Sequence, residues 1–226
     1  MRPLLASLLL ILLVASAAFG DRSDGVKRLQ RSTEVLQEIM KAPDKGIPGD
    51  LLDKAACIVV VPGLKKGGIG LGAKYGKGEI ICRTADRKWS APLFITIEGG
   101  SIGLQLGFTQ IDVIMLIMNH KGVDKLISDK FTIGADASAA AGPVGRQTSA
   151  STNARMDAEI LTYSRAKGLF AGVSLDGATL RPDKDDNRSF YGKELDPKSI
   201  ISGEVPVPAE ARPLASALSW QSPREK

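Results

Sequence analysis

Aromatic residues, histidine and cysteine are all scarce in this chain of 226 residues: 5% are aromatic, one is histidine and two are cysteine. Few rings are available to stack on bases, and the basic excess is small at a formal charge of +5, so nucleic-acid binding is not expected. No ligand spacing surrounds the single histidine, His120, which argues against a zinc site. Glycine is abundant at 24 residues, which favours a β-rich fold with tight turns.

The glycine-rich stretch 67–79 lacks the signatures of a nucleotide loop. A phosphate loop ending at Gly76-Lys77 would need glycine in place of Leu71 and a hydroxyl residue in place of Gly78. A dinucleotide fingerprint starting at Gly68 would have to open a helix, whereas the following residues alternate as in a strand. No serine has the context of a catalytic nucleophile. The sequence therefore predicts a protein that is not an enzyme and has no cofactor.

An acidic segment partly matches a calcium-binding loop. The first, third, fifth and twelfth positions of such a loop are held by Asp183, Asp185, Asn187 and Glu194. Arg188 stands where the turn needs glycine, and no flanking helices are expected. We therefore expect a charged, solvated loop over residues 181–188 and no metal site.

The first 20 residues have the composition of a secretory signal peptide. Arg2 gives a short positive region, residues 4–14 are apolar, and Ser16-Ala17-Ala18 offers small residues for cleavage. The apolar run is short for a spanning helix, although an uncleaved anchor is the alternative. An exported chain with Cys57 and Cys82 can form a disulfide, but two buried thiols are equally compatible with their apolar surroundings.

Residues 24–41 predict an amphipathic helix. Apolar residues recur at helical spacing in a stripe of Val26, Leu29, Thr33, Leu36 and Met40, widened by Val35 and Ile39. Lys27, Arg28 and Arg31 lie mostly off that stripe. Such a helix either lies on a membrane surface or docks on the protein's own sheet, and we expect docking because the core is always available.

Strand patterns fill the middle of the chain. Residues 56–61 predict a buried strand that Pro62-Gly63 would stop, followed by a Lys65-Lys66 loop. Residues 69–75 and 79–83 predict a hairpin that turns at 76–78. Residues 93–98 alternate as a strand, and Gly99-Gly100 predicts a tight hairpin turn into a second strand.

The remaining pattern predicts short elements. We expect a short helix at 123–129, a small-residue strand at 131–141, two strands at 159–164 and 168–174, and a turn at Asp176-Gly177. Beyond residue 195 proline is frequent, and short helices are expected at 199–204 and 210–220.

Several motifs in one order resemble the SYLF family, also called the Ysc84 or actin-regulator domain. They are WSAPLFI, GGSIGLQLG, GADASAAAGPVGR, YSRAKGLFAGVSLDG and NRSFYG, and they span about residues 25–195. The family positions that match are Trp89, Gly103, Gly107, Asp136, Gly142, Arg146, Tyr163, Gly168 and Tyr191. The exported, bacterial-type relatives are often lipoproteins, but no cysteine follows the apolar run here.

The resemblance implies a lipid-binding module, since eukaryotic relatives bind phosphoinositides and fungal relatives bind and bundle actin. We expect an α+β fold in which a curved antiparallel sheet or barrel is flanked by the N-terminal amphipathic helix and short helices. The expected divisions are a signal peptide at 1–20, a SYLF-like domain at 24–195 and a proline-rich C-terminal extension at 196–226.

The expected function is non-enzymatic binding of anionic phospholipid or another amphiphile at the cell envelope, in the periplasm or outside the cell. The candidate lipid contacts, chosen on charge and helix position, are Lys27, Arg28, Arg31, Lys65, Lys66 and Arg146. The alternative is a structural or interaction module that binds an envelope protein. An enzyme would need a pocket joining Asp136, Arg146 and His120 or a thiol, which nothing in the sequence favours.

Overall fold

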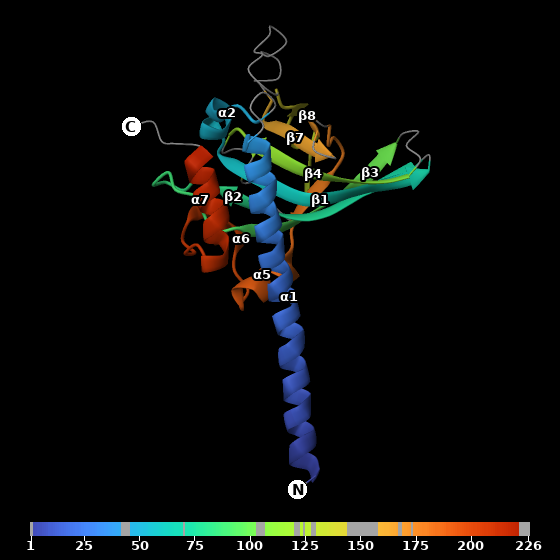
Figure 1. Ribbon diagram of the computed structural model, residues 1–226, viewed down its shortest axis with the longest axis vertical. Coiled ribbons are helices and arrows are strands. Elements are labelled where there is room, and N and C mark those ends of the chain that lie inside the picture. Colours follow the sequence, from blue (N-terminus) through green and yellow to red (C-terminus); the bar gives the residue numbers. More distant parts are fainter. Residues whose placement is uncertain are drawn as a thin grey trace.

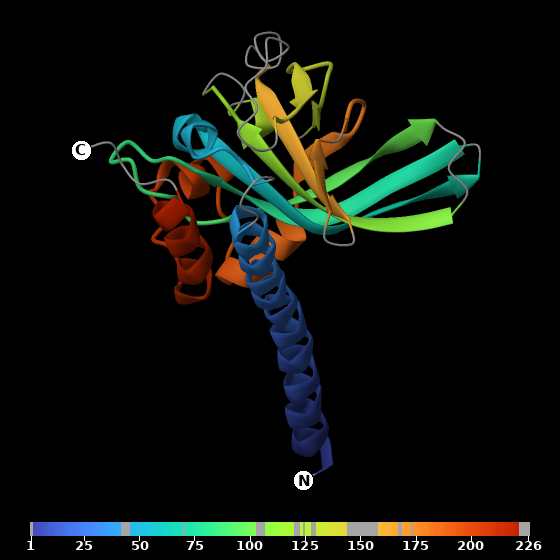
Figure 2. The same ribbon diagram turned by 45° about the horizontal axis from the view of Figure 1, so that its top comes forward.

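The computed structural model describes residues 2–41, 46–69, 71–102, 107–119, 123, 125–127, 130–143, 158–166, 169–172 and 174–221. Within these ranges the fold is α+β, as predicted. Nine strands form one sheet in the order β5-β9-β3-β2-β1-β4-β7-β6, with β8 paired to β7. The pairs are antiparallel except β6 and β7, and the sheet is strongly curled (Figure 1, Figure 2).

The strands, in chain order, are β1 (Cys57–Ile69), β2 (Leu71–Cys82), β3 (Leu93–Ile102), β4 (Gly107–Ile117), β5 (Phe131–Thr132), β6 (Ala139–Ala141), β7 (Ile160–Ala166), β8 (Leu169–Gly172) and β9 (Thr179–Pro182). The helices are α1 (Arg2–Lys41), α2 (Gly49–Lys54), α5 (Lys184–Tyr191), α6 (Pro197–Ser202), the 3-10 turn η1 (Ala209–Ala211) and α7 (Arg212–Gln221).

Both faces of β1 and β2 are buried over residues 57–61 and 78–82, and each face belongs to a separate core. The inner face carries Val61 and Leu64 of β1 and packs against β5, β9 and α6. The outer face carries Ile58 and Val60 and is covered by α1, α2 and α7. Strand alternation therefore decides which core each residue of β1 and β2 enters.

The outer face is where α1 docks. Leu29, Leu36 and Ile39 are buried there, as the helical stripe predicted, and α7 adds Leu214 and Leu218 beside them. The helix runs unbroken from Arg2, and its first half projects away from the sheet in both views (Figure 1, Figure 2). No helix in the described part of the chain is both long and apolar enough to cross a membrane. Cleavage of residues 1–20 stays a prediction.

The predicted stop at Pro62-Gly63 is wrong, because β1 passes through it as a β-bulge. The register with both neighbouring strands shifts between Val60 and Lys65. A bulge absorbs a proline, which cannot donate to the ladder, and it allows the positive φ of Gly63 (73°). The Gly63 amide donates to the Asp112 carboxylate at 2.9 Å. The predicted Lys65-Lys66 loop is therefore part of a strand.

Both predicted glycine hairpins are also wrong. β2 continues unbroken through Gly76 and Gly78, and β3 continues through Gly99 and Gly100. Neither Gly99 nor Gly100 has a positive φ. β2 pairs with β1 and β3, whereas β3 and β4 are consecutive in the chain but not neighbours in the sheet. Glycine marks these strands for another reason, since a Cβ on Gly76 would lie 2.8 Å from Val61 Cγ1.

Two further expectations are settled in the same region. Cys57 and Cys82 face each other across β1 and β2 and form a disulfide. The predicted loop at 181–188 is instead the end of β9 and the helix α5. The Asp183 side chain caps that helix by accepting from the Asp186 amide at 3.1 Å. Of the helix expected at 123–129, Val123, Lys125 and Leu126 are helical, while residues 124, 128 and 129 lie outside the described residues.

Candidate functional site

A groove of about 470 Å³ lies between α1 and the outer face of β1 and β2, and basic side chains dominate it. They are contributed by α1, β1 and β2 and are Lys27, Arg28, Arg31, Lys65 and Lys77. Asp24, Tyr75 and Gln110 also line the groove. We call this the α1–sheet groove.

The structure brings together four of the predicted contact residues in this groove. Lys27, Arg28 and Arg31 come from one helical face, and Lys65 comes from the strand opposite. Lys66 is not with them, because neighbouring residues of a strand point to opposite faces. Arg146 lies outside the described residues. Lys77, Tyr75 and Gln110 were missed, since only the pairing of Lys65 with Tyr75 and Gln110 reveals that these residues share the site.

Two of the basic side chains are already held by carboxylates at the start of α5. Arg28 forms an ion pair with Asp186 at 2.7 Å, and its guanidinium lies 5.4 Å from the centre of the Phe94 ring. Lys77 contacts Asp183 at 2.9 Å and Asp186 at 3.0 Å. Burial alone would lower the pKa of Lys77, but the hydrogen bonds and charges of these aspartates outweigh it and raise the pKa. The ion pairs of Arg28 and Lys77 therefore stabilise the packing of α1 and β2 against α5, in addition to placing positive charge in the groove.

The basic side chains at the rim of the groove make fewer ion pairs than Arg28 and Lys77. Lys27 makes an exposed ion pair with Asp24 at 3.3 Å, which is worth little in water. Arg31 and Lys65 are exposed, and no ion pair of either is found within the described residues. These two side chains are therefore the ones in the groove most available to an anionic ligand.

An exposed aromatic patch continues from the groove along the outer face. Tyr75 is 47% exposed and Phe108 is 95% exposed. Phe108 pairs with Gly67 across β1 and β4, and its ring lies over that glycine, where a Cβ would come within 2.3 Å of it. A side chain at position 67 would therefore collide with the ring in this position. Aromatic rings beside basic side chains are typical of surfaces that meet the membrane interface.

A buried carboxyl group, that of Glu79 on β2, lies on the same outer face as the groove. Glu79 is fully buried, and neither of its oxygens accepts a geometrically sound hydrogen bond from the described residues. Burial raises the pKa of Glu79 to about 8, and the Ser32 hydroxyl and the Arg28 charge offset only part of the rise. At neutral pH this group is mainly a neutral acid.

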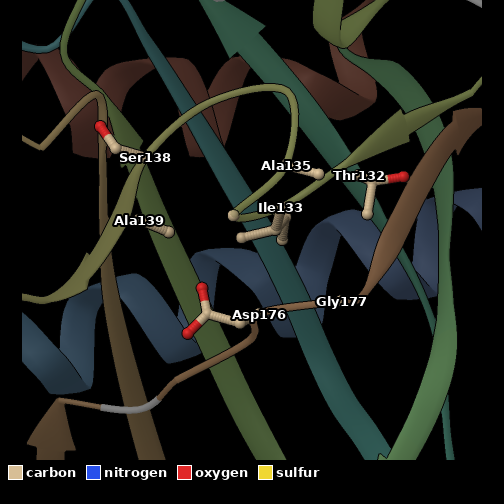
Figure 3. A pocket seen from close by; sticks show the side chains of 8 residues that line it. Thr132, Ile133, Ala135, Ser138, Ala139, Asp176 and Gly177 are labelled. Atoms are coloured by element: carbon tan, nitrogen blue, oxygen red, sulfur yellow. The ribbon is translucent and has the colours of Figure 1, made fainter.

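A second hollow, of about 490 Å³, lies on the inner side between the β5–β6 turn and the turn before β9. In Figure 3 the Asp176 side chain points toward the segment of Ser138 and Ala139. Asp176 accepts from the Ser174 hydroxyl at 2.7 Å, and Gly134 has a positive φ of 87° beside it. The described residues contain no cluster of metal-ligating side chains. The hollow is therefore a turn-lined depression without assembled chemistry.

Most described family-motif residues have structural roles. The Asp136 carboxylate accepts from the Thr132 amide at 2.6 Å, and the Tyr191 hydroxyl donates to the Pro92 carbonyl at 2.6 Å. A Cβ on Gly142 would lie 2.1 Å from the buried Tyr163 ring. Arg83 lies over the Trp89 ring at 4.1 Å. These residues build the scaffold that carries the groove.

The curled sheet carries the basic α1–sheet groove on the outer face of β1 and β2. Residues 98–220 match the Ysc84 family model, described as a Las17-binding protein actin regulator. The chain belongs to this family.

Its relatives carry the domain within longer proteins. The chain is 34% identical over 201 residues to SH3 domain-containing YSC84-like protein 1 of Rattus norvegicus, covering 88% of this chain and 58% of the relative. It is 32% identical over 197 residues to Protein YSC84 of Saccharomyces cerevisiae, covering 84% and 42%. It is 36% identical over 179 residues to LAS seventeen-binding protein 3 of the same species, covering 77% and 39%. The chain thus spans about half the length of these relatives.

Proposed function

We propose that this protein is a non-enzymatic module that binds anionic phospholipid surfaces through the α1–sheet groove. The observation that carries the proposal is the convergence of basic side chains from α1, β1 and β2 on one groove. Each basic residue close to an anionic surface contributes about 1 kcal/mol to binding. The exposed rings of Tyr75 and Phe108 lie on the same face and would enter the interface beside the headgroups.

Vesicle co-sedimentation of the full chain tests this proposal. We expect binding to vesicles that contain phosphatidylserine or a phosphoinositide, weaker binding in high salt, and little binding to neutral phosphatidylcholine vesicles. Arg31→Glu combined with Lys65→Glu should weaken anionic binding at least tenfold, because it reverses the two rim charges. Phe108→Ser should weaken it less and without changing the salt dependence.

A matched control carries the same change in net charge elsewhere. Lys54 on α2 and Lys193 after α5 are exposed and do not line the groove. Lys54→Glu combined with Lys193→Glu should therefore retain most of the binding. Equal losses in the two double variants would show that net charge, and not the groove, governs binding. No binding to either vesicle type would overturn the proposal.

A protein partner is the second candidate function. The family description names Las17 binding and actin regulation, and the yeast relative carries Las17 binding in its own name. The same groove would then receive an acidic segment of a protein. Absence of vesicle binding, together with capture of an acidic peptide that Arg31→Glu abolishes, would favour this candidate.

We also propose that residues 1–20 direct export, so that the mature chain acts in the periplasm or outside the cell. The composition of that segment supports the proposal. Mass spectrometry of the protein purified from its native compartment should show a start near residue 20. A mature chain that retains Met1 would contradict it.

A further inference from the structure

The inner face of the sheet carries a pair of lysines that no feature of the groove explains. Lys66 of β1 lies directly opposite Lys74 of β2 in the antiparallel register. Lys66 shares its face with Leu64, and Lys74 shares its face with Ile80, and both of these belong to the inner core. Directly opposite residues bring their Cβ atoms to about 5 Å. Two cations are therefore held side by side on the concave side, away from α1.

Burial makes this pair unusual. Lys74 is only 8% exposed, and Lys66 is partly buried. Burial and the charge of Lys74 lower the pKa of Lys66. No carboxylate reaches either ammonium within the described residues, since no ion pair or hydrogen bond of theirs is found there. Like charges directly opposite on a sheet are destabilising, and burial adds to that cost.

The surroundings of the pair differ on its two sides. Lys66 pairs on its other side with Thr109 of β4, which contributes a hydroxyl to the same row. Lys74 pairs on its other side with Gly99 of β3, and the turn before β9 lies over that glycine, since a Cβ there would come within 2.9 Å of Ala178 Cα. The row across β4, β1 and β2 thus presents a hydroxyl and two ammonium groups on one face, and it is open to solvent on the β4 side, where Thr109 is exposed. Phosphate oxygens are well matched by such donors.

We propose that Lys66, Lys74 and Thr109 form a second anion site, on the inner face of the sheet, that binds a phosphate group. The phosphate belongs either to a free phosphate or phosphate monoester or to a phospholipid headgroup. A dianion placed between the ammonium groups turns their repulsion into two attractions. This site is independent of the α1–sheet groove, because it lies on the opposite face of the same two strands.

Titration of the full chain with inorganic phosphate tests the site, with NMR of the lysine side chains as the readout. We expect saturable shifts of Lys66 and Lys74 and a rise in the pKa of Lys66 toward its ordinary value. Lys74→Met should weaken phosphate binding at least tenfold, whereas Lys74→Arg should keep it because the charge remains. Lys54→Met is the matched control, since Lys54 is an exposed lysine on α2 that lies in neither site, and it should leave phosphate binding unchanged.

A second titration distinguishes the two phosphate sources. Monomeric short-chain phosphatidic acid that displaces inorganic phosphate and binds at least tenfold more tightly would identify a lipid headgroup, whereas weaker binding would identify a free phosphate or monoester.

Thermal unfolding of each variant verifies that it is folded. Absence of saturable phosphate binding to the wild type, or equal binding by wild type and Lys74→Met, would overturn the proposal. The Arg31→Glu and Lys65→Glu double variant should lose vesicle binding but keep the phosphate site, so the two proposals fail separately.

Discussion

Lys65 and Lys66 are adjacent in the chain, yet they belong to two differently organised charged regions. On the outer face, buried charges are paired with charges from other elements: Arg28 with Asp186, and Lys77 with Asp183 and Asp186. On the inner face, Lys66 and Lys74 lie opposite each other without a carboxylate among the described residues.

The contrast shows two ways in which a sheet carries buried charge. Paired charges on the outer face attach α1 and α5 to the strands. Removing one partner would therefore leave the other as a buried charge without an ion pair, which destabilises the protein. The inner lysines attach nothing, so their removal relieves repulsion. Charge on the first face therefore serves stability, and charge on the second is a cost that a bound anion would offset.

The largest effect that we predict is the pH dependence of stability caused by Glu79, a buried carboxyl group on the outer face. Its pKa in the folded state is about 8, above the ordinary value of 4.5, so the folded protein holds a proton that the unfolded chain releases between these values. The free energy of unfolding should fall by up to about 1.4 kcal/mol per pH unit across that range. Glu79→Gln should remove this fall, as measured by urea unfolding from pH 5 to 9.

The matched control for Glu79 is Glu98→Gln on the same face, where Glu98 is half-buried and pairs with Arg181 at 3.4 Å. That variant should keep the wild-type pH dependence above pH 5. Parallel stability curves for wild type and Glu79→Gln would show that Glu79 ionises normally in the folded protein.

An intermediate effect is expected at Asp183, which serves several partners at once. Its carboxylate caps α5, accepts from the Thr96 hydroxyl at 2.9 Å and contacts Lys77. We expect Asp183→Ala to lower the free energy of unfolding by about 2 to 3 kcal/mol. Asp185→Ala, which removes an exposed ion pair with Arg188, should change it by less than about 0.5 kcal/mol.

The contribution of Asp183 also has a predictable pH window. Burial would raise its pKa, but hydrogen bonds from Lys77, the Asp186 amide and Thr96 lower it below the ordinary value of 3.8. Its stabilisation is therefore complete above about pH 4 and is lost as the pH falls through the lower folded-state value. Chemical unfolding between pH 2 and 5 should show a steeper acid loss for the wild type than for Asp183→Ala.

The smallest predicted effect is a gain in stability, in contrast to the losses predicted above. Lys74→Met removes an ammonium that is buried opposite another, so we expect it to stabilise the protein by about 1 kcal/mol in phosphate-free buffer. Lys65→Met, on the exposed outer side, should change stability by less than about 0.5 kcal/mol. Thermal unfolding with and without phosphate measures both. A destabilised Lys74→Met protein would mean that Lys74 has a stabilising role on the inner face.

Much of the fold follows from local patterns in the sequence. The stripe of Leu29, Leu36 and Ile39 predicted the docked helix, and the alternation over residues 93–98 predicted β3, because both depend on periods within one element. The bulge at Pro62-Gly63 was not predictable in this way. Proline and glycine punctuate a chain locally, but here Asp112 from β4 holds the bulge open within a continuing strand.

The candidate site was predicted in part for the same reason. Charge and helix position selected Lys27, Arg31 and Lys65, which the structure gathers in one groove. Lys66 was grouped with Lys65 because a loop was expected, and a strand separates them by its alternation. Lys77 and Tyr75 entered the groove through the register of β1 with β2, which depends on contacts between distant residues.

The packing of α1 against α7 has a consequence for how the chain folds while it is being synthesised. Arg22 on α1 reaches Glu210 across 188 residues of sequence, with 2.8 Å between their charged atoms. At typical rates of translation, on the order of 5–20 residues per second, about 10–40 s separate the emergence of these partners. During that interval the apolar stripe of α1 lacks the cover of Leu214 and Leu218. The nascent chain therefore keeps this apolar face uncovered until α7 has been made, and chaperones bind exposed apolar surface of this kind.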